Sequence, residues 1–96
     1  MSRITDQNLH AVAARINKLM GTPAETYTKV GDAYKANVGN YHLSFAYGGA
    51  SLHRIDNDQG GTTDVLNIGY VKKGELYSAM FAFIAGVYAG REEPKA

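Results

Sequence analysis

The feature that most restricts the fold is a run of fifteen residues, 76–90, that contains no charged side chain. Crossing a bilayer requires about 18–20 apolar residues, so a run of this length predicts a helix of a soluble domain. The bulky side chains of this helix form two stripes at helical spacing. The first stripe is Leu76, Met80, Phe83 and Val87, and the second is Tyr77, Phe81, Ile84 and Tyr88. A sheet can bury only one stripe, so the other needs a different cover.

A third line of the same helix, every fourth residue from Ser78 to Gly90, carries only small side chains. Two arrangements follow. In one, an N-terminal helix packs on this small line and both helices share the sheet. In the other, the second stripe closes a homodimer or docks a partner, because large apolar patches on soluble proteins usually mark interfaces. We favour the second arrangement, with Tyr77, Phe81, Ile84 and Tyr88 as the predicted interface.

Size and composition indicate one globular domain. The chain has 96 residues, of which 45% are apolar and 20% charged. We predict a single domain over 1–96, with an ordered core at about 4–90 and a polar tail at 91–96. A domain of this size buries only about 60–65% of its unfolded surface, so binding a partner would add stability.

Charge and cysteine content disfavour several functions. The net charge of +1 provides no basic field for a polyanion. Because the chain has no cysteine, disulfides, thiolate nucleophiles and cysteine-rich zinc sites are excluded. The first residues lack the apolar stretch of a secretory signal, which predicts a cytoplasmic protein.

The remaining pattern predicts a helix and several strands. Thr5 is a good N-cap, Ile4 can pack on Leu9, and Gly21 provides a stop, so a helix is expected over 6–20. Alternating residues predict strands over 34–38, 41–47, 50–55 and 65–71, with the last helix ending near 89. The predicted fold is α+β: a three- or four-stranded antiparallel meander with an N-terminal and a C-terminal helix packed on one face.

Two-residue turns at 39–40 and 48–49 would pair Val38 with Tyr41 and Tyr47 with Ala50. In that register, the face under the helices carries the rows Tyr34-Phe45-Leu52 and Ala36-Leu43-Arg54. The opposite face carries the row Lys35-Ser44-His53. The predicted ligand- or partner-binding residues are Lys35, Tyr41, His42, Ser44, His53, Arg54, Lys72 and Lys73.

A serine beside a histidine can be activated for catalysis, but this pattern supplies no third group to orient the imidazole and no oxyanion hole. The polar face is therefore interpreted as a solvated or binding surface, and the chain as a non-enzyme. The three histidines lack metal-ligand spacing, and the loop that starts at Asp56 lacks the glutamate that ends a calcium loop. No metal or cofactor is expected.

The segment 39–49, Gly-Asn-Tyr-His-Leu-Ser-Phe-Ala-Tyr-Gly-Gly, continues to Leu52-His53-Arg54, then to 69–71 and 75–77. This pattern resembles a group of small uncharacterised proteins of tailed bacteriophages and prophages. The resemblance implies an accessory product made in the cytoplasm of the host bacterium. It also implies binding and inhibition of a host protein, for example a defence system such as CRISPR-Cas, and it provides no catalytic residues.

The leading hypothesis is therefore a non-enzymatic phage protein, a homodimer through its last helix, that binds a host protein. One alternative is a sponge for a signalling nucleotide, held by Tyr41, His42, His53, Arg54 or the Lys72-Lys73 pair. Another alternative is a small RNA- or DNA-binding module at residues 70–73, where aromatic and basic side chains alternate.

Overall fold

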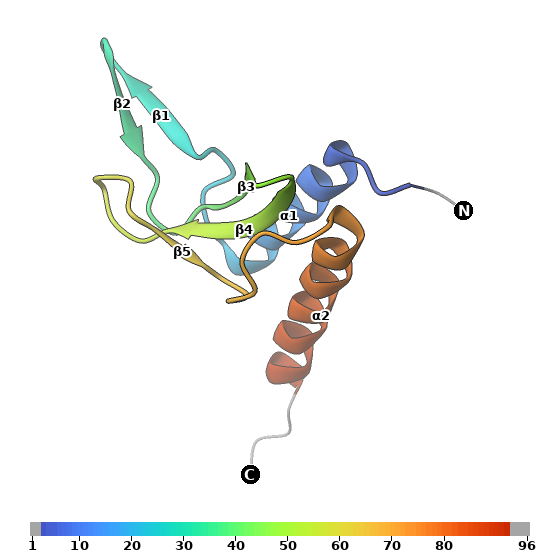
Figure 1. Cartoon of the computed structure of the whole chain (residues 1–96). Coiled ribbons are helices and arrows are strands. Elements are labelled where there is room, and N and C mark those ends of the chain that lie inside the picture. The colour runs from blue at the N-terminus through green and yellow to red at the C-terminus, as the bar shows by residue number, and fades with distance from the viewer. Residues whose placement is uncertain (1–2, 93–96) are drawn as a thin grey trace.

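The computed structural model describes residues 3–92 and contains two helices and five strands (Figure 1). In chain order they are α1 (Asp6–Met20), β1 (Tyr27–Val30), β2 (Ala33–Ala36), β3 (Tyr41–Ala46), β4 (Gly49–Ile55), β5 (Thr62–Asp64) and α2 (Lys73–Glu92). Strands β3, β4 and β5 form an antiparallel meander, and β1 and β2 form a separate two-stranded sheet. The predicted α+β class is confirmed.

The first helix begins and ends where the sequence predicted. The Asn8 backbone N–H donates to Thr5 Oγ1 at 3.1 Å, and the Thr5 N–H donates to Asn8 Oδ1 at 2.9 Å. This reciprocal capping box satisfies two backbone donors at the helix start. At the other end, Gly21 adopts the left-handed conformation with φ 70° and closes the helix.

Both helices cover the same face of the three-stranded sheet, and together they form the core. The buried core residues are Leu9, Val12, Ala13 and Ile16 from α1, Tyr41, Ala50 and Leu52 from the sheet, and Leu76, Met80 and Ile84 from α2. Lys73 Nζ lies 2.7 Å from the Asp6 carboxylate, and the Arg91 guanidinium donates to the Leu19 carbonyl at 2.7 Å. These end contacts show that the helices run in the same direction along each other.

Both helices share the sheet, as the first arrangement expected, but α2 buries a central line drawn from both predicted stripes. Leu76, Met80 and Ile84 are fully or almost fully buried, so the inclusion of Ile84 in the exposed interface was wrong. The small line is exposed to solvent, so the prediction that α1 packs on it was also wrong. The physical reason is that α2 lies beside α1 on the sheet, so that α1 and strand β4 both pack against α2 and cover its central line from two sides. The helix also passes through Gly90 to Glu92, and residues 93–96 of the predicted tail lie outside the described residues.

The predicted hairpin between 34–38 and 41–47 was wrong, because β2 pairs with β1. Asn37 joins the end of β2 to the segment before β1. Its backbone N–H donates to the Thr26 carbonyl, and its side-chain Nδ2 donates to the Glu25 carbonyl at 2.9 Å. The buried Asn40 side chain then donates to the Pro23 carbonyl at 2.8 Å. Residues 37–40 therefore connect two sheets instead of turning within one.

The β3–β4 hairpin turns at Tyr47 and Gly48, both with positive φ, and pairs Ala46 with Gly49. The predicted pairing of Tyr47 with Ala50 was wrong because Gly49 belongs to the strand. A Cβ at Gly49 would lie 2.9 Å from the Val71 carbonyl oxygen, and Ala50 and Val71 exchange backbone hydrogen bonds.

Compared with the predicted register, each strand residue pairs two positions away, which preserves the face of every side chain. Leu43 and Leu52 therefore pack under the helices as expected, but as direct partners. The two predicted rows on that face are wrong, because Tyr34 lies in the ribbon and Arg54 pairs with Tyr41.

The predicted strand over 65–71 is mostly a turn, and the third strand of the meander is Thr62–Asp64. The Asp64 carboxylate accepts backbone hydrogen bonds from Asn67 at 3.1 Å and from Gly69 at 2.7 Å. These bonds stabilise a turn in place of the predicted strand. Of residues 65–71, Val65 donates its N–H to the Leu52 carbonyl of β4 at 3.0 Å, and Val71 forms an isolated bridge to Ala50.

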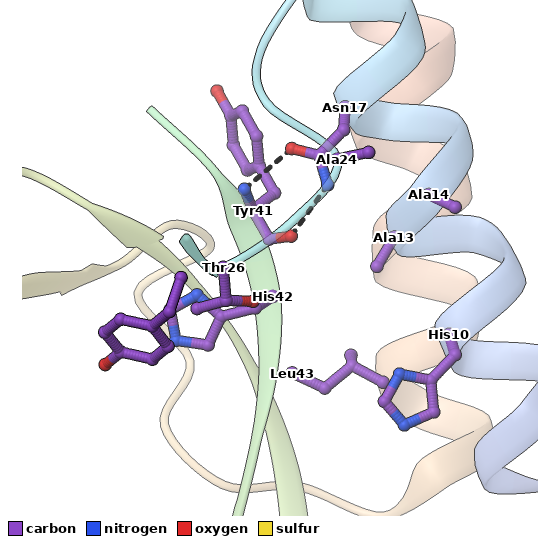
Figure 2. A pocket seen from close by; sticks show the side chains of 10 residues that line it. His10, Ala13, Ala14, Asn17, Ala24, Thr26, Tyr41, His42 and Leu43 are labelled. Carbon is purple, nitrogen blue, oxygen red and sulfur yellow. Dashed lines mark hydrogen bonds between the residues drawn. The ribbon is translucent and has the colours of Figure 1, made fainter. Parts of the chain in front are cut away.

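Helix α1 is joined to the edge strand β3 by one buried amide, that of Asn17 (Figure 2). Asn17 Nδ2 donates to the Tyr41 carbonyl at 2.9 Å, and Asn17 Oδ1 accepts from the Tyr41 N–H at 2.7 Å. The same Oδ1 accepts from the Thr22 hydroxyl at 2.8 Å. The side chain thus occupies the position that a neighbouring strand would take beside Tyr41.

Replacing this amide should destabilise the fold strongly. In Asn17→Ala, the buried N–H and C=O groups of Tyr41 lose their partners, so the free energy of unfolding should fall by roughly 2–4 kcal/mol. Urea denaturation followed by circular dichroism measures this change. Lys18→Ala, at the exposed neighbouring position, is the control and should change stability by no more than about 0.5 kcal/mol. Equal stability of the two variants would contradict the role of Asn17.

Candidate interaction surfaces

Strand β3 is an edge strand whose outward backbone groups are partly unpaired. The Ile55 N–H donates to the Asn40 carbonyl, whereas the N–H and C=O of Tyr41 point away from β4, to Asn17. Because this direction alternates along an antiparallel strand, the backbone groups of Leu43 and Phe45 also point outward. Within residues 3–92, no hydrogen bond to the outward groups of these two residues is found.

Beside this edge lies a cavity of about 360 Å³, shown in Figure 2. One wall is α1, which contributes Ala13 and Ala14, and another is the segment that contains Ala24 and Thr26. In Figure 2, the Leu43 side chain extends toward α1 and His10, while His42 lies on the other side of the strand. The small side chains leave space next to the β3 backbone.

The outer face of the sheet carries a cluster of aromatic and histidine rings. The ring centroids of His42 and His53 are 6.1 Å apart, those of His53 and Tyr70 are 5.9 Å apart, and those of Tyr47 and Tyr70 are 5.5 Å apart. The Ser44 and Tyr70 hydroxyls are 2.8 Å apart and form a hydrogen bond.

The predicted Lys35-Ser44-His53 row is therefore wrong. Ser44 pairs with Ser51 in the sheet, and its hydroxyl binds Tyr70 rather than an imidazole. Lys35 lies on the β1–β2 ribbon, because β2 does not pair with β3. His53 instead pairs with His42.

The pKa of His42 is lowered from its ordinary value, first because burial penalises the charged imidazolium and second because His53 opposes a second positive charge. Its Nδ1 atom is buried and has no hydrogen-bond partner among the described residues. The folded protein therefore favours a neutral imidazole at this position.

The other predicted binding residues do not come together. Tyr41 belongs to the core, where its ring lies 6.0 Å from that of Phe83, so it cannot form part of an exposed binding face. Arg54 is exposed and lies 3.5 Å from the Asp56 carboxylate. Because Arg54 is one residue from His53 in the same strand, the two side chains point to opposite faces. Lys72 and Lys73 lie at the start of α2, and Lys73 pairs with Asp6.

The predicted interface on α2 is only partly accessible. The rings of Tyr77 and Phe81 are 4.9 Å apart and half-buried, and the Arg15 guanidinium lies 5.9 Å from the centre of the Phe81 ring. With Ile84 in the core, only Tyr88 of the four predicted interface residues is exposed. Helix α1 thus covers much of the aromatic stripe that the sequence left without a partner.

The sequence-based prediction missed the β1–β2 ribbon, which projects from the body of the protein in Figure 1. The ribbon exposes three large side chains, Tyr27, Val30 and Tyr34, and the last is 69% exposed. A local signal was present: Gly31 and Asp32 form a two-residue turn between short runs rich in tyrosine and β-branched residues.

In the described part of the chain, no group of three or more potential metal-ligating side chains converges. No helix among these residues is long and apolar enough to cross a membrane. Comparison with known proteins gave no match to any family model, to any curated protein or to any solved structure. The resemblance to phage accessory proteins thus rests on the sequence pattern alone.

The lowered pKa of His42 predicts a loss of stability in acid. Above about pH 6.5, the ordinary value, the imidazole is neutral in both states and its full contribution is present. As the pH falls below that value, the unfolded chain takes up a proton that the folded chain resists, so the free energy of unfolding decreases. Urea denaturation between pH 7.5 and 5 should show this slope.

The slope should be smaller in His42→Gln, which removes the buried imidazole, and also reduced in His53→Gln, which removes the opposing charge. His10→Gln, on the exposed face of α1, controls for the loss of a histidine as such. An identical slope in wild type and His42→Gln would contradict this account.

Proposed function

We propose that this chain is a non-enzymatic protein-binding module whose β1–β2 ribbon contacts the partner. The observation that carries the proposal is that Tyr27, Val30 and Tyr34 are exposed on a ribbon that neither α1 nor α2 covers. A two-stranded hairpin alone is marginally stable in water. Tyr27 and Tyr34 lie on one face of the ribbon and Val30 on the other, so a partner that encloses the ribbon would bury apolar area and stabilise the ribbon.

The charge of the ribbon supports a protein partner rather than a nucleic acid. Within residues 25–36, Lys29 and Lys35 are balanced by Glu25 and Asp32. With two lysines and no net positive charge, such a surface gives little counterion release on a phosphate backbone, which is the main source of affinity for nucleic acids. Tyrosine, by contrast, is enriched in the cores of protein interfaces.

The resemblance to tailed-phage accessory proteins extends the proposal to the class of partner. The partner would be a protein of the host bacterium, such as a component of a defence system, and binding would inhibit it. This part of the proposal rests on the sequence pattern of residues 39–49, 52–54, 69–71 and 75–77 and not on the ribbon.

The two alternatives have weaker support. For the nucleotide sponge, the residues Tyr41, His42, His53 and Arg54 do not share one site, because Tyr41 is buried and Arg54 lies on the other face of the sheet from the histidines. The other candidate for the sponge, the Lys72-Lys73 pair, has Lys73 bound to Asp6. A nucleic-acid site at 70–73 would depend on two lysines, and one of them, Lys73, is paired with Asp6 at 2.7 Å.

The test removes the apolar area of the ribbon while keeping its strand propensity. In the double variant Val30→Thr, Tyr34→Thr, capture of partner proteins from a bacterial lysate should fall about tenfold or more, because each lost anchor contributes about 1 kcal/mol or more to binding. Quantitative mass spectrometry of the captured proteins measures the effect. Thermal unfolding should show that the variant remains folded.

Lys29→Thr is the matched control, since it changes the same ribbon without removing apolar area, and it should capture the partner as wild type does. Equal capture by the double variant would contradict the assignment of the ribbon. Loss of capture after nuclease treatment would favour the nucleic-acid alternative.

A further inference from the structure

We propose that the open edge of β3 pairs with the same edge of a second copy of this chain. Each three-stranded sheet would then continue into the other across a two-fold axis. This proposal is independent of the ribbon, because the two surfaces belong to different sheets.

The β3 edge lacks the features that normally prevent pairing between edges. Proteins protect edge strands with charges, proline, bulges or short length. Strand β3 has six residues with no charge and no proline, and its pairing with β4 is continuous from Tyr41 to Ala46. The opposite edge, β5, has three residues and includes Asp64, and the ribbon carries Lys29 and Lys35. Among the described strands, β3 is thus the unprotected one.

The outward groups of β3 determine the register of such pairing. The Asn17 amide already binds the outward N–H and C=O of Tyr41, and the strand ends at the Tyr47-Gly48 turn. Only the outward backbone groups of Leu43 and Phe45 therefore remain free to pair with a second strand. If Leu43 faced Leu43 of the second copy, Phe45 would face the occupied Tyr41. If Phe45 faced itself, Leu43 would face the turn. Only the register that pairs Leu43 with Phe45 of the second copy, and the reverse, satisfies all the open groups.

The side chains are compatible with this register. On the helix-covered face, Phe45 would pack on Leu43 of the second copy, and Phe45 is 46% exposed in the single chain. On the outer face, Ser44 would lie opposite Ser44 of the second copy, on the two-fold axis. No pair of like charges is created, because β3 has no charged residue.

Space is available at the edge. The cavity beside Leu43 is walled on α1 by the small residues Ala13 and Ala14 and by His10, whose ring lies 6.2 Å from that of Phe45, so a second strand would enter along the alanines and pack against His10. Ala14 is exposed on α1. Small residues at this position allow the two copies of α1, which lie on the same side of the continued sheet, to approach each other.

A single cysteine tests the register directly, because the chain contains none. The Ser44 pair on the axis would be a non-hydrogen-bonded antiparallel pair, with Cα atoms about 4.5 Å apart, which lies within the range that a disulfide spans. Under mild oxidation, the Ser44→Cys variant should form a covalent dimer more than about tenfold faster than Thr62→Cys. Thr62 is exposed on the opposite edge strand and lies on the same face of the sheet, so it is the matched control.

A second variant keeps the proposal falsifiable if Ser44→Cys affects folding. Light scattering coupled to gel filtration should show a dimer for wild type and a monomer for Phe45→Lys, with circular dichroism confirming that Phe45→Lys is folded. Three outcomes would overturn the proposal. The first is a wild-type protein that is monomeric at about 100 μM, because its dimerisation would then be too weak for a stable complex. The second is a dimer that persists in Phe45→Lys, and the third is an equal oxidation rate for the two cysteine variants. The first would leave the edge open to an extended segment of another protein, and the second would place the interface elsewhere, for example on α2.

Discussion

The structure depends on the buried amide of Asn17, which joins α1 to the backbone of Tyr41. Tyr41 is the first residue of β3, so this contact determines where the strand starts and how α1 lies across the sheet. It has a second effect on the same edge. By occupying the outward groups of Tyr41, the amide restricts the open part of β3 to Leu43 and Phe45. One side chain therefore both stabilises the fold and limits how another strand can bind.

The protein divides into a packed body and a projecting ribbon. The body buries a continuous cluster from α1, α2 and the meander, whereas the ribbon is held mainly by its own pairing and by Asn37. If the edge pairing holds, a dimer would carry two ribbons and could bind a partner that presents two sites. Such binding gains affinity through effective concentration without any new contact.

The sequence predicted the elements whose signals are local. The limits of α1 follow from Thr5 and Gly21, and the faces of β3 and β4 follow from alternation, which a shift of two residues does not disturb. The register was wrong because it depends on a contact distant in sequence, the packing of Gly49 against the backbone of Tyr70 and Val71. The ribbon was missed although Gly31 and Asp32 signal a turn, because the second run was assigned to a pairing with 41–47.

The candidate site was less predictable than the fold. The order of polar residues along the chain did not reveal that Ser44 would bind Tyr70 or that His42 would face His53, since both depend on the register. For α2, the two stripes of bulky side chains in the sequence could not show that α1 and the sheet pack against the helix from two sides. The placement of Ile84 in the core follows from that geometry and not from its spacing.

The position of α2 at the end of the described chain affects synthesis in the cell. Leu76, Met80 and Ile84 complete the core, so a nascent chain that has emerged only as far as the meander lacks one wall of its hydrophobic interior. Until translation delivers those residues beyond the ribosomal tunnel, the uncharged β3 strand is exposed to other nascent chains. Expression yield should therefore respond to the speed at which residues 73–92 are translated and to chaperone supply.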